Sequence, residues 1–341
     1  MGNNQNKTNI YDDGAGPALV TGAAGFIGFH TAQRLLAQGR RVVGVDNFSP
    51  YYDVQLKRDR LAQLTPHAAF SFVELDIADK AAMEKLWADQ GPFREVVHLA
   101  AQAGVRYSLT NPYEYIRTNC MGHLTVMEMC RHTSDFKHLV YASSSSVYGS
   151  NEKLPFSVKD DVSHPISLYA ATKRSDELMS QSYSHLYDMP QTGLRFFTVY
   201  GPWGRPDMSL FIFTKAIVAG DKVPVFNHGQ MKRDFTYVDD IVSGVVSVLD
   251  KPPVREGKNA PHRVLNIGNT RSENLMDFIG IIENELGRRA DLQFMEMQPG
   301  DVPETFADIS ETTALTGFIP HTTIAQGVPK FIAWYKNYYN I

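Results

Sequence analysis

The sequence predicts an α/β protein in which one parallel sheet carries helices on both faces. Short apolar segments alternate with segments of helical periodicity up to about residue 200, which is typical of parallel strands joined by helical crossovers. A glycine-rich turn separates the first strand from the first helix. Beyond residue 200, proline and glycine become more frequent and the alternation weakens, which indicates a second, smaller α/β domain.

The predicted strands are short and largely apolar, and small or polar residues follow each of them. They span residues 18–21, 41–45, 70–75, 95–99, 138–142 and 193–197. Ligands of open α/β sheets bind at the carboxyl ends of the strands. We therefore predict a Rossmann-type, doubly wound sheet whose functional residues lie just beyond its strands.

The same patterns divide the chain into three parts. Residues 1–16 are rich in Asn, Asp and Gly and lack the apolar core of a signal peptide, so we expect a flexible tail. Residues 17–199 are predicted to form the nucleotide-binding domain and residues 200–341 a substrate-binding domain. A helix and a strand within residues 236–270 are expected to rejoin the first sheet.

The glycine turn has the features of a dinucleotide-binding site. Gly22, Gly25 and Gly28 follow the first strand with the spacing G-x-x-G-x-x-G, which differs from the standard G-x-G-x-x-G. Such glycines let backbone N–H groups approach a pyrophosphate at the positive end of a helix. Asp46 ends the second strand, where an acid accepts hydrogen bonds from the adenosine ribose and repels a 2′-phosphate. We predict NAD, in preference to NADP, as the cofactor.

A tyrosine and a lysine stand at helical spacing some two dozen residues after a run of four serines. Lys173 lies one helical turn from Tyr169, so its charge favours the phenolate and lowers the pKa of the tyrosine towards that of a general base. A hydroxyl from the serine run at 143–146 can hold the substrate oxygen that loses its proton.

Composition narrows the class of protein. A net charge of −4 and a pI of about 6.3 do not favour a nucleic-acid or membrane partner. No segment approaches the ~20 apolar residues that cross a bilayer. Cys120 and Cys130 lack metal-ligand spacing and are expected to be free thiols of a reducing compartment. These features predict a cytoplasmic enzyme without a bound metal.

The motifs together resemble the extended short-chain dehydrogenase/reductase family, in particular its nucleotide-sugar epimerases. The resemblance rests on the glycine turn, Asp46-Asn47, Asp76-Ile77, the serine run and Tyr169-x-x-x-Lys173, and it extends from Ala18 to the C-terminus. Three irregular segments, at residues 102–108, 195–208 and 298–302, are similar to those of family members that act on UDP-glucuronate.

The resemblance implies 4-epimerisation between UDP-glucuronate and UDP-galacturonate through a 4-keto sugar, with transient NADH. Tyr169 matches the base, and Lys173 matches the residue that binds the nicotinamide ribose. Ser144, four positions before Tyr148, matches the catalytic hydroxyl, although Ser143 and Ser145 are close enough to remain alternatives. The residues predicted to bind NAD are Gly22, Gly25, Phe26, Ile27, Gly28, Asp46, Asn47, Asp76, Ile77, Leu99, Ala100, Ala101, Asn119, Tyr169 and Lys173.

The residues after the catalytic hydroxyl distinguish sister enzymes. Dehydratases of the family carry an Asp-Glu pair there, and decarboxylases keep a glutamate before Val-Tyr-Gly, whereas this chain has Ser145 and Ser146. Serine is neither acid nor base near neutral pH. We expect Ser145, Ser146 and Thr198 to donate hydrogen bonds to the substrate carboxylate and to prevent its loss. The alternative is that both serines bond local backbone at the strand end.

Arginines are expected to bind the substrate diphosphate. Arg233 matches the family arginine near the uridine ribose and phosphates, Arg205 lies in the predicted substrate loop, and Arg106 is a candidate for phosphate or carboxylate. Asp301 is a candidate for the uridine ribose. Related epimerases often carry an arginine shortly before this position, whereas this chain has Gln298-Pro299, which weakens that assignment.

Two other functions remain open from the sequence. One is a different nucleotide-sugar enzyme of the family, either a UDP-glucuronate decarboxylase or an epimerase of neutral or acetamido sugars. The other is a non-catalytic NAD-binding sensor, against which the intact Ser144, Tyr169 and Lys173 argue. Helices around residues 112–132 and 169–187 resemble those that pair subunits in this family, so a homodimer is expected.

Overall fold

The structure, a computed structural model, describes residues 16–298 and 300–341. Residues 1–15 of the predicted tail therefore lie outside the described residues. Within the described part of the chain, no helix is both long enough and apolar enough to cross a membrane.

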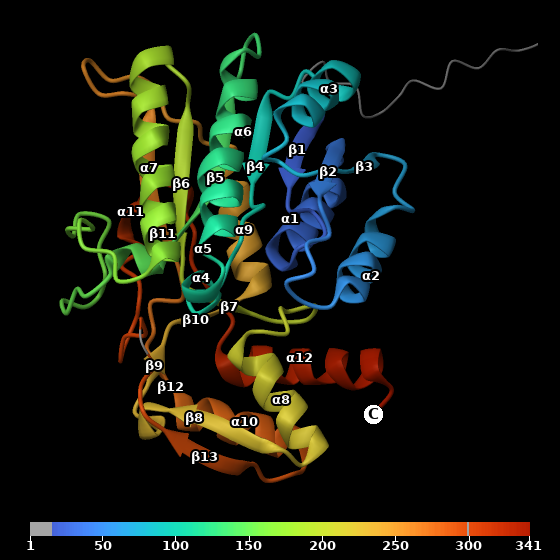
Figure 1. Cartoon of the computed structure of the whole chain (residues 1–341), viewed down its shortest axis with the longest axis vertical. Helices are drawn as coiled ribbons and strands as arrows, with labels where there is room; N and C mark the ends of the chain where they lie inside the picture. Colours follow the sequence, from blue (N-terminus) through green and yellow to red (C-terminus); the bar gives the residue numbers. More distant parts are fainter. Residues whose placement is uncertain (1–15, 299) are drawn as a thin grey trace, which may run out of the picture.

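Seven parallel strands form the central sheet in the order β11-β6-β5-β4-β1-β2-β3 (Figure 1). They are β1 (Ala18–Thr21), β2 (Val42–Asp46), β3 (Phe70–Glu74), β4 (Glu95–His98), β5 (His138–Ser144), β6 (Gln191–Phe196) and β11 (His262–Ile267). The strand order reverses between β1 and β4, and in open sheets this switch point marks the ligand crevice. The predicted doubly wound parallel sheet is confirmed.

Successive residues of a strand point to opposite faces of the sheet, and each face packs against its own apolar core. Val20 and Val140 pack on the side of α1 and α9, whereas Leu19 and Leu139 pack on the side of α3, α6 and α7. All four side chains are fully buried, and each such burial stabilises the fold by about 1.5–3 kcal/mol. The helices of the two faces are α1 (Phe26–Ala37), α2 (Val54–Leu64), α9 (Val238–Leu249), α3 (Lys80–Gln90), α6 (Gly122–Arg131) and α7 (Leu168–Tyr187).

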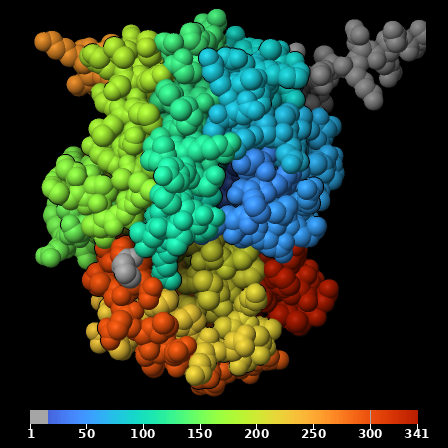
Figure 2. All heavy atoms as spheres, in the orientation of Figure 1, coloured from blue at the N-terminus to red at the C-terminus, as the bar shows by residue number. Residues whose placement is uncertain are grey.

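A smaller lobe lies beyond the carboxyl ends of the strands (Figure 1). Its elements are α8 (Ser209–Ala219), β8 (Lys222–Phe226), η3 (Asn227–Gly229), α10 (Leu275–Leu286), β13 (Asp291–Met295) and α12 (Ile324–Tyr339). Figure 2 shows this lobe, coloured yellow to red, as the lower mass of the molecule. Between α8 and α10 the chain returns to the main sheet as α9 and β11, where α11 (Ser310–Thr316) also packs.

Eight short elements complete the described part of the chain. They are α4 (Tyr107–Thr110), α5 (Pro112–Tyr115), the π-helical turn η1 (Ile116–Met121), the 3-10 turn η2 (Ser145–Tyr148), β7 (Thr198–Tyr200), β9 (Lys232–Arg233), β10 (Phe235–Tyr237) and β12 (Glu273–Asn274). Strand β7 pairs with β10 and β9 pairs with β12, so two small ladders join the sheet to the second lobe.

Helix α7 begins at the carboxyl edge of the sheet and positions the predicted Tyr-Lys pair there. The Ser167 side chain caps it by accepting a hydrogen bond from Ala170 N, and the left-handed Asp188 follows its last residue. Tyr169 is therefore in the first turn, and Lys173 lies one turn later on the face that packs against β5.

A fully buried arginine joins the two lobes. The Arg60 side chain of α2 donates to the carbonyls of Ala24, Trp203 and Gly204 and to the Tyr52 hydroxyl, over distances of 2.7–3.1 Å. These contacts use all five N–H groups of the guanidinium. They hold the start of the predicted substrate loop against the glycine turn.

Candidate active site

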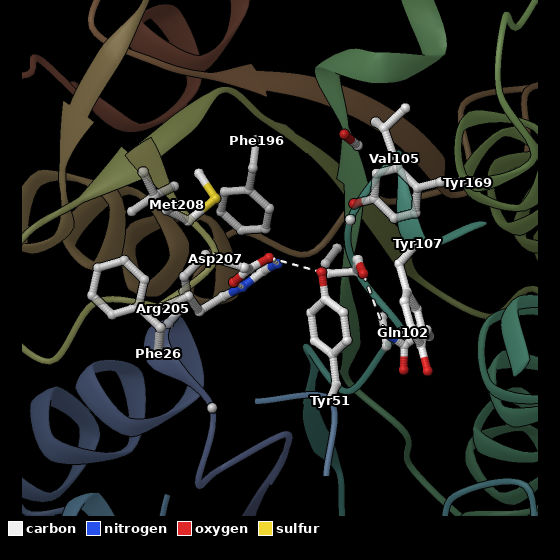
Figure 3. Close-up of a pocket in the computed structure, with 18 of the residues that line it drawn as sticks. Phe26, Tyr51, Gln102, Val105, Tyr107, Tyr169, Phe196, Arg205, Asp207 and Met208 are labelled. Carbon is white, nitrogen blue, oxygen red and sulfur yellow. Dashed lines mark hydrogen bonds and ion pairs between the residues drawn. The ribbon is translucent and has the colours of Figure 1, made fainter. Parts of the chain in front are cut away.

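A cavity of about 690 Å³ lies between the carboxyl ends of the strands and the second lobe (Figure 3). Most of the predicted site residues line it. They are Gly22, Gly25, Phe26, Ile27, Gly28, Asp46, Asn47, Ile77, Leu99, Ala100, Ala101, Arg106, Ser144, Ser145, Ser146, Tyr169, Lys173, Thr198, Arg205, Arg233 and Asp301.

Two predicted residues, Asn119 and Asp76, lie behind the cavity wall. Asn119 is buried, and its amide bonds both backbone groups of Gln102 and the Thr172 hydroxyl at 2.8–3.1 Å. It thereby orders the segment after β4. Asp76 lies 2.7 Å from Arg117 and accepts a hydrogen bond from the Asn47 side chain at 3.3 Å. Both residues support groups that line the cavity.

The glycine turn has no room for side chains. A Cβ added to Gly28 would lie 2.0 Å from Gly22 O, and Gly22 itself has a φ of +73° and packs against the backbone of Ala100. No side chain caps the first N–H groups of α1, and the residues of this first turn, Phe26, Ile27 and Gly28, line the cavity. Such a turn fits a pyrophosphate, as the sequence predicts.

The end of the cavity beside β2 contains a cation that the sequence analysis missed. Asp46 is buried, accepts a hydrogen bond from Phe48 N at 2.9 Å, and lies 3.8 Å from the ammonium of Lys57. Lys57 is on α2, which the Asp53 side chain caps. No motif marks this lysine, because only the fold brings α2 beside the end of β2.

The predicted catalytic groups meet where β5 ends. The Lys173 ammonium donates to Ala142 O at 3.0 Å and lies 3.2 Å from a carboxylate oxygen of Asp176. The ring of Tyr169 packs edge-to-face on Tyr115 at 6.0 Å, and its hydroxyl faces the cavity (Figure 3). A phenol, an ammonium and the serine run therefore border one space.

The serine hydroxyls have different partners. Ser143 Oγ donates to Glu177 at 2.6 Å, and Arg195 donates to both oxygens of that carboxylate at 2.8 and 2.9 Å. Burial raises the pKa of Glu177, but hydrogen bonds from Arg195 and its positive charge outweigh this effect and hold the pKa below its usual value. The Ser144 Oγ accepts from Ser146 N at 3.1 Å and keeps its own proton for a ligand.

An arginine, an aspartate and a tyrosine form a cluster across the cavity (Figure 3). Arg205 donates twice to Asp207, and the Tyr51 hydroxyl donates to the same carboxylate at 2.9 Å. Burial raises the pKa of Asp207, but Arg205 and these hydrogen bonds outweigh it, so the pKa lies below its usual value. Sequence analysis missed Tyr51 and Asp207, although Asp207 stands two positions from Arg205.

The remaining predicted substrate residues lie on the second lobe and opposite it. Arg106 and Asp301 pair with each other at 3.0 Å, and the guanidinium of Arg106 lies over the ring of Phe226. Arg233 donates to the carbonyls of Lys232 and Pro303. Burial lowers the pKa of Arg233, so a bound anion would compensate for its desolvation.

Comparison with known proteins identifies relatives over most of the chain. The sequence profile of the NAD dependent epimerase/dehydratase family matches residues 18–268. The chain is 51% identical to Protein CapI of Staphylococcus aureus, covering 94% of this chain and 98% of that protein. It is 46% identical to a probable UDP-glucuronate 4-epimerase of Rhizobium meliloti, with 94% and 97% covered.

A solved structure is also similar. The UDP-glucuronic acid 4-epimerase of Bacillus cereus, in complex with UDP-glucuronic acid and NAD, superimposes with a TM-score of 0.86 at 33% sequence identity. The match covers 95% of this chain and 100% of that chain.

The position of Asp46 predicts which dinucleotide binds. We expect NADP⁺ to bind the apoenzyme at least about tenfold more weakly than NAD⁺, because the 2′-phosphate would meet a buried carboxylate. In Asp46→Asn the Lys57 ammonium remains, so the preference should shrink markedly. Isothermal titration with both dinucleotides measures the ratio. Asp53→Asn, at the exposed start of α2, is the control. Equal affinities in the wild type would contradict the assignment of Asp46.

Proposed function

The chain belongs to the NAD dependent epimerase/dehydratase family, and we propose that it interconverts UDP-glucuronate and UDP-galacturonate by epimerisation at C4. One observation carries the proposal: Tyr169, Lys173 and Ser144 border the same cavity as three further hydroxyls, those of Ser145, Ser146 and Thr198. The names of the relatives in Rhizobium meliloti and Bacillus cereus support this choice of substrate.

The profile match and the similar solved structure confirm two predictions, namely the family and an NAD-dependent epimerase. The residues on the dinucleotide side of the cavity fit NAD, since the glycine turn excludes side chains and Asp46 and Lys57 border the adenosine end. When bound, NAD supplies the acceptor and donor of the C4 hydride. The rest of the chemistry falls to the side chains of the protein.

Tyr169 serves as the base in this proposal. It takes the proton of the sugar C4 hydroxyl, while Ser144 donates a hydrogen bond to the same oxygen. The Lys173 ammonium, one turn along α7, favours the phenolate that this step requires. After the 4-keto sugar has turned its other face to the cofactor, Tyr169 returns the proton, so the cycle is balanced in protons.

The hydroxyl cluster of Ser145, Ser146 and Thr198 is proposed to hold the sugar carboxylate. A 4-keto uronate is a β-keto acid and loses CO₂ most easily when its carboxylate is desolvated and aligned with the ketone. Hydroxyl donors keep the carboxylate hydrogen-bonded and fix its orientation. Arg106 is less available for this role because Asp301 already pairs with it.

The diphosphate is proposed to bind at Arg233. The charge of Arg205 is shared with Asp207, whereas Arg233 donates to two backbone carbonyls and to the uncharged sulfur of Met231. A half-buried guanidinium with carbonyl partners retains its full charge for a phosphate. The second lobe, which carries Arg233, is accordingly proposed as the substrate-binding domain.

A homodimer is proposed from the apolar surface on one side of the sheet. Exposed large apolar side chains gather on α5, η1 and α7: Tyr113, Ile116, Met121, Leu178, Leu186 and Tyr187. These helices pack beside one another, so their exposed side chains form one surface. Burying such a surface against a second copy would remove it from water.

Replacing one residue of this surface tests the dimer. Leu178 is 52% exposed, and we expect Leu178→Glu to give a monomer in light scattering at a concentration where the wild type is dimeric. Val254→Glu, at a position that is 69% exposed elsewhere, is the matched control and should not change the mass. A monomeric wild type would contradict the proposal.

Turnover of the proposed substrate is the main test of function. Purified protein with UDP-glucuronate and no stoichiometric cofactor should yield UDP-galacturonate, resolved by NMR. Tyr169→Phe should reduce turnover by roughly 10³-fold or more, because it removes the base but keeps the ring against Tyr115. Bound NAD should remain at the wild-type level, and substantial turnover by the variant would remove Tyr169 from its role.

Alanine variants test the hydroxyl cluster. A hydrogen bond to a charged group contributes about 1.5–3 kcal/mol, so losing the hydroxyl of Ser145, Ser146 or Thr198 should raise KM for UDP-glucuronate roughly ten- to a hundredfold. Some UDP-pentose should appear beside the epimer, because the carboxylate is then free to align with the ketone. Ser247→Ala, on α9 outside the cavity, is the control.

The neutral substrate provides the second comparison. UDP-glucose has no carboxylate, so the wild type should turn it over poorly and the alanine variants should not lose further activity with it. If the alanine variants bind UDP-glucuronate normally and release no pentose, the hydroxyls stabilise the protein structure and do not bind the carboxylate.

A further inference from the structure

A buried carboxylate lies directly behind the lysine of the proposed catalytic pair. Asp176 follows Lys173 by three positions on α7, and the two residues are only 1% and 4% exposed. One oxygen of Asp176, Oδ2, lies 3.2 Å from the Lys173 ammonium. Within residues 16–298 and 300–341, its other oxygen has no hydrogen-bond partner. A buried carboxylate with one unsatisfied oxygen reduces stability, so its position requires an explanation.

The contacts of Lys173 indicate what Asp176 does. An ammonium has three N–H donors. One binds Ala142 O at the end of β5, and a second binds Asp176, so two donors are held on the protein side. The third is left for the cavity that Lys173 lines together with Tyr169. Asp176 thus fixes the rotation of the ammonium and the direction of its free donor.

We propose that Asp176 is a positioning residue for the epimerisation: it anchors the Lys173 ammonium from behind, and its negative charge weakens the effect of Lys173 on the ionisation of Tyr169. The inference rests on the proposed function, because it takes Tyr169 as the base.

The carboxyl group of Asp176 gains or loses its charge near neutral pH. Burial raises the pKa of Asp176 to about 7, against the opposing effect of Lys173. Below this pH the acid is neutral, and the full charge of Lys173 favours the Tyr169 phenolate. Above it the carboxylate is ionised, and the Lys173–Asp176 pair has no net charge. The net charge behind the cavity face of Lys173 therefore depends on the protonation of Asp176.

The other titratable groups that face Asp176 keep one charge state near neutral pH: Cys120 of η1, His123 of α6, Tyr141 of β5 and Glu177 of α7. Burial lowers the pKa of the histidine and raises the pKa of the thiol and the phenol, so these three groups are uncharged. Hydrogen bonds and the charge of Arg195 keep Glu177 ionised against its burial. Within this cluster, Asp176 is therefore the group whose charge changes near neutral pH.

The pH profile of Asp176→Asn tests the electrostatic part of the inference. The amide keeps the shape and an acceptor for Lys173 but removes the charge. We expect the foot of the acidic limb of kcat to stay in place, because Asp176 is already neutral there in the wild type. The part of the limb above the pKa of Asp176 should move to lower pH by about half a unit, so that the limb becomes steeper and kcat there rises about threefold. An unmoved limb in a folded variant would overturn the inference. Asp89→Asn, an exposed acid on α3, is the control.

A second variant separates the hydrogen bond that Asp176 accepts from Lys173 from the negative charge of Asp176. Asp176→Ala removes both, so the ammonium loses one of its two protein partners. We expect kcat to fall roughly tenfold and bound NAD to be lost more readily than from Asp176→Asn. Equal NAD retention and equal kcat in the two variants would overturn the anchoring role.

A readout without turnover distinguishes this inference from the proposed function. The absorbance difference between the holoenzyme and its Tyr169→Phe variant measures the Tyr169 phenolate directly across the pH range. In Asp176→Asn this signal should develop at lower pH, even if UDP-glucuronate proves not to be the substrate. If the wild type epimerises UDP-glucuronate and the phenolate signal does not move, the inference about Asp176 alone fails.

Discussion

The site depends on a buried ion pair that fixes α7 to the central sheet. Arg195 of β6 donates to both carboxylate oxygens of Glu177 on α7, and Ser143 of β5 donates to the same group. A bidentate pair of this kind sets orientation as well as distance, and removing one partner of a buried pair costs about 3–5 kcal/mol. Because Glu177 lies one turn beyond Lys173, this contact sets the register of the whole Tyr-Lys face over the end of β5.

The second constraint is the attachment of the substrate loop to the nucleotide-binding lobe. Arg60 bonds the carbonyls of Trp203 and Gly204, and His30 of α1 bonds Pro202 O at 3.0 Å. Burial lowers the pKa of His30 to about 4, so this side chain is neutral and acts through hydrogen bonding alone. The loop that leads to Arg205 is therefore held by the helices that flank the glycine turn.

The sequence predicted the features that depend on local patterns, and it could not predict those that depend on contacts between distant parts of the chain. The glycine turn and the Tyr169–Lys173 spacing are local features, and strand and helix periodicity place them at one edge of the sheet. Lys57 has no motif, and Tyr51 meets Asp207 across 156 positions of the chain. Arg106 and Asp301 were both predicted from the sequence as substrate residues, but their mutual pairing across 195 positions is a property of the fold. The sequence gives the kinds of side chain at a site, whereas the fold determines which charged groups are paired and which can still bind a ligand.

This distinction supports the proposal that hydroxyl groups recognise the substrate carboxylate. Four cations that line the cavity each have an acid beside them: Lys57 with Asp46, Arg106 with Asp301, Lys173 with Asp176 and Arg205 with Asp207. Each pair reduces the field that a bound anion feels. Arg233 differs, because its direct partners are two carbonyl groups and the sulfur of Met231, which supports the proposal that it binds the diphosphate. With the cations committed, neutral donors at the end of β5 and on β7 can orient a uronate without the rigid charge pairing that would oppose rotation of the 4-keto sugar.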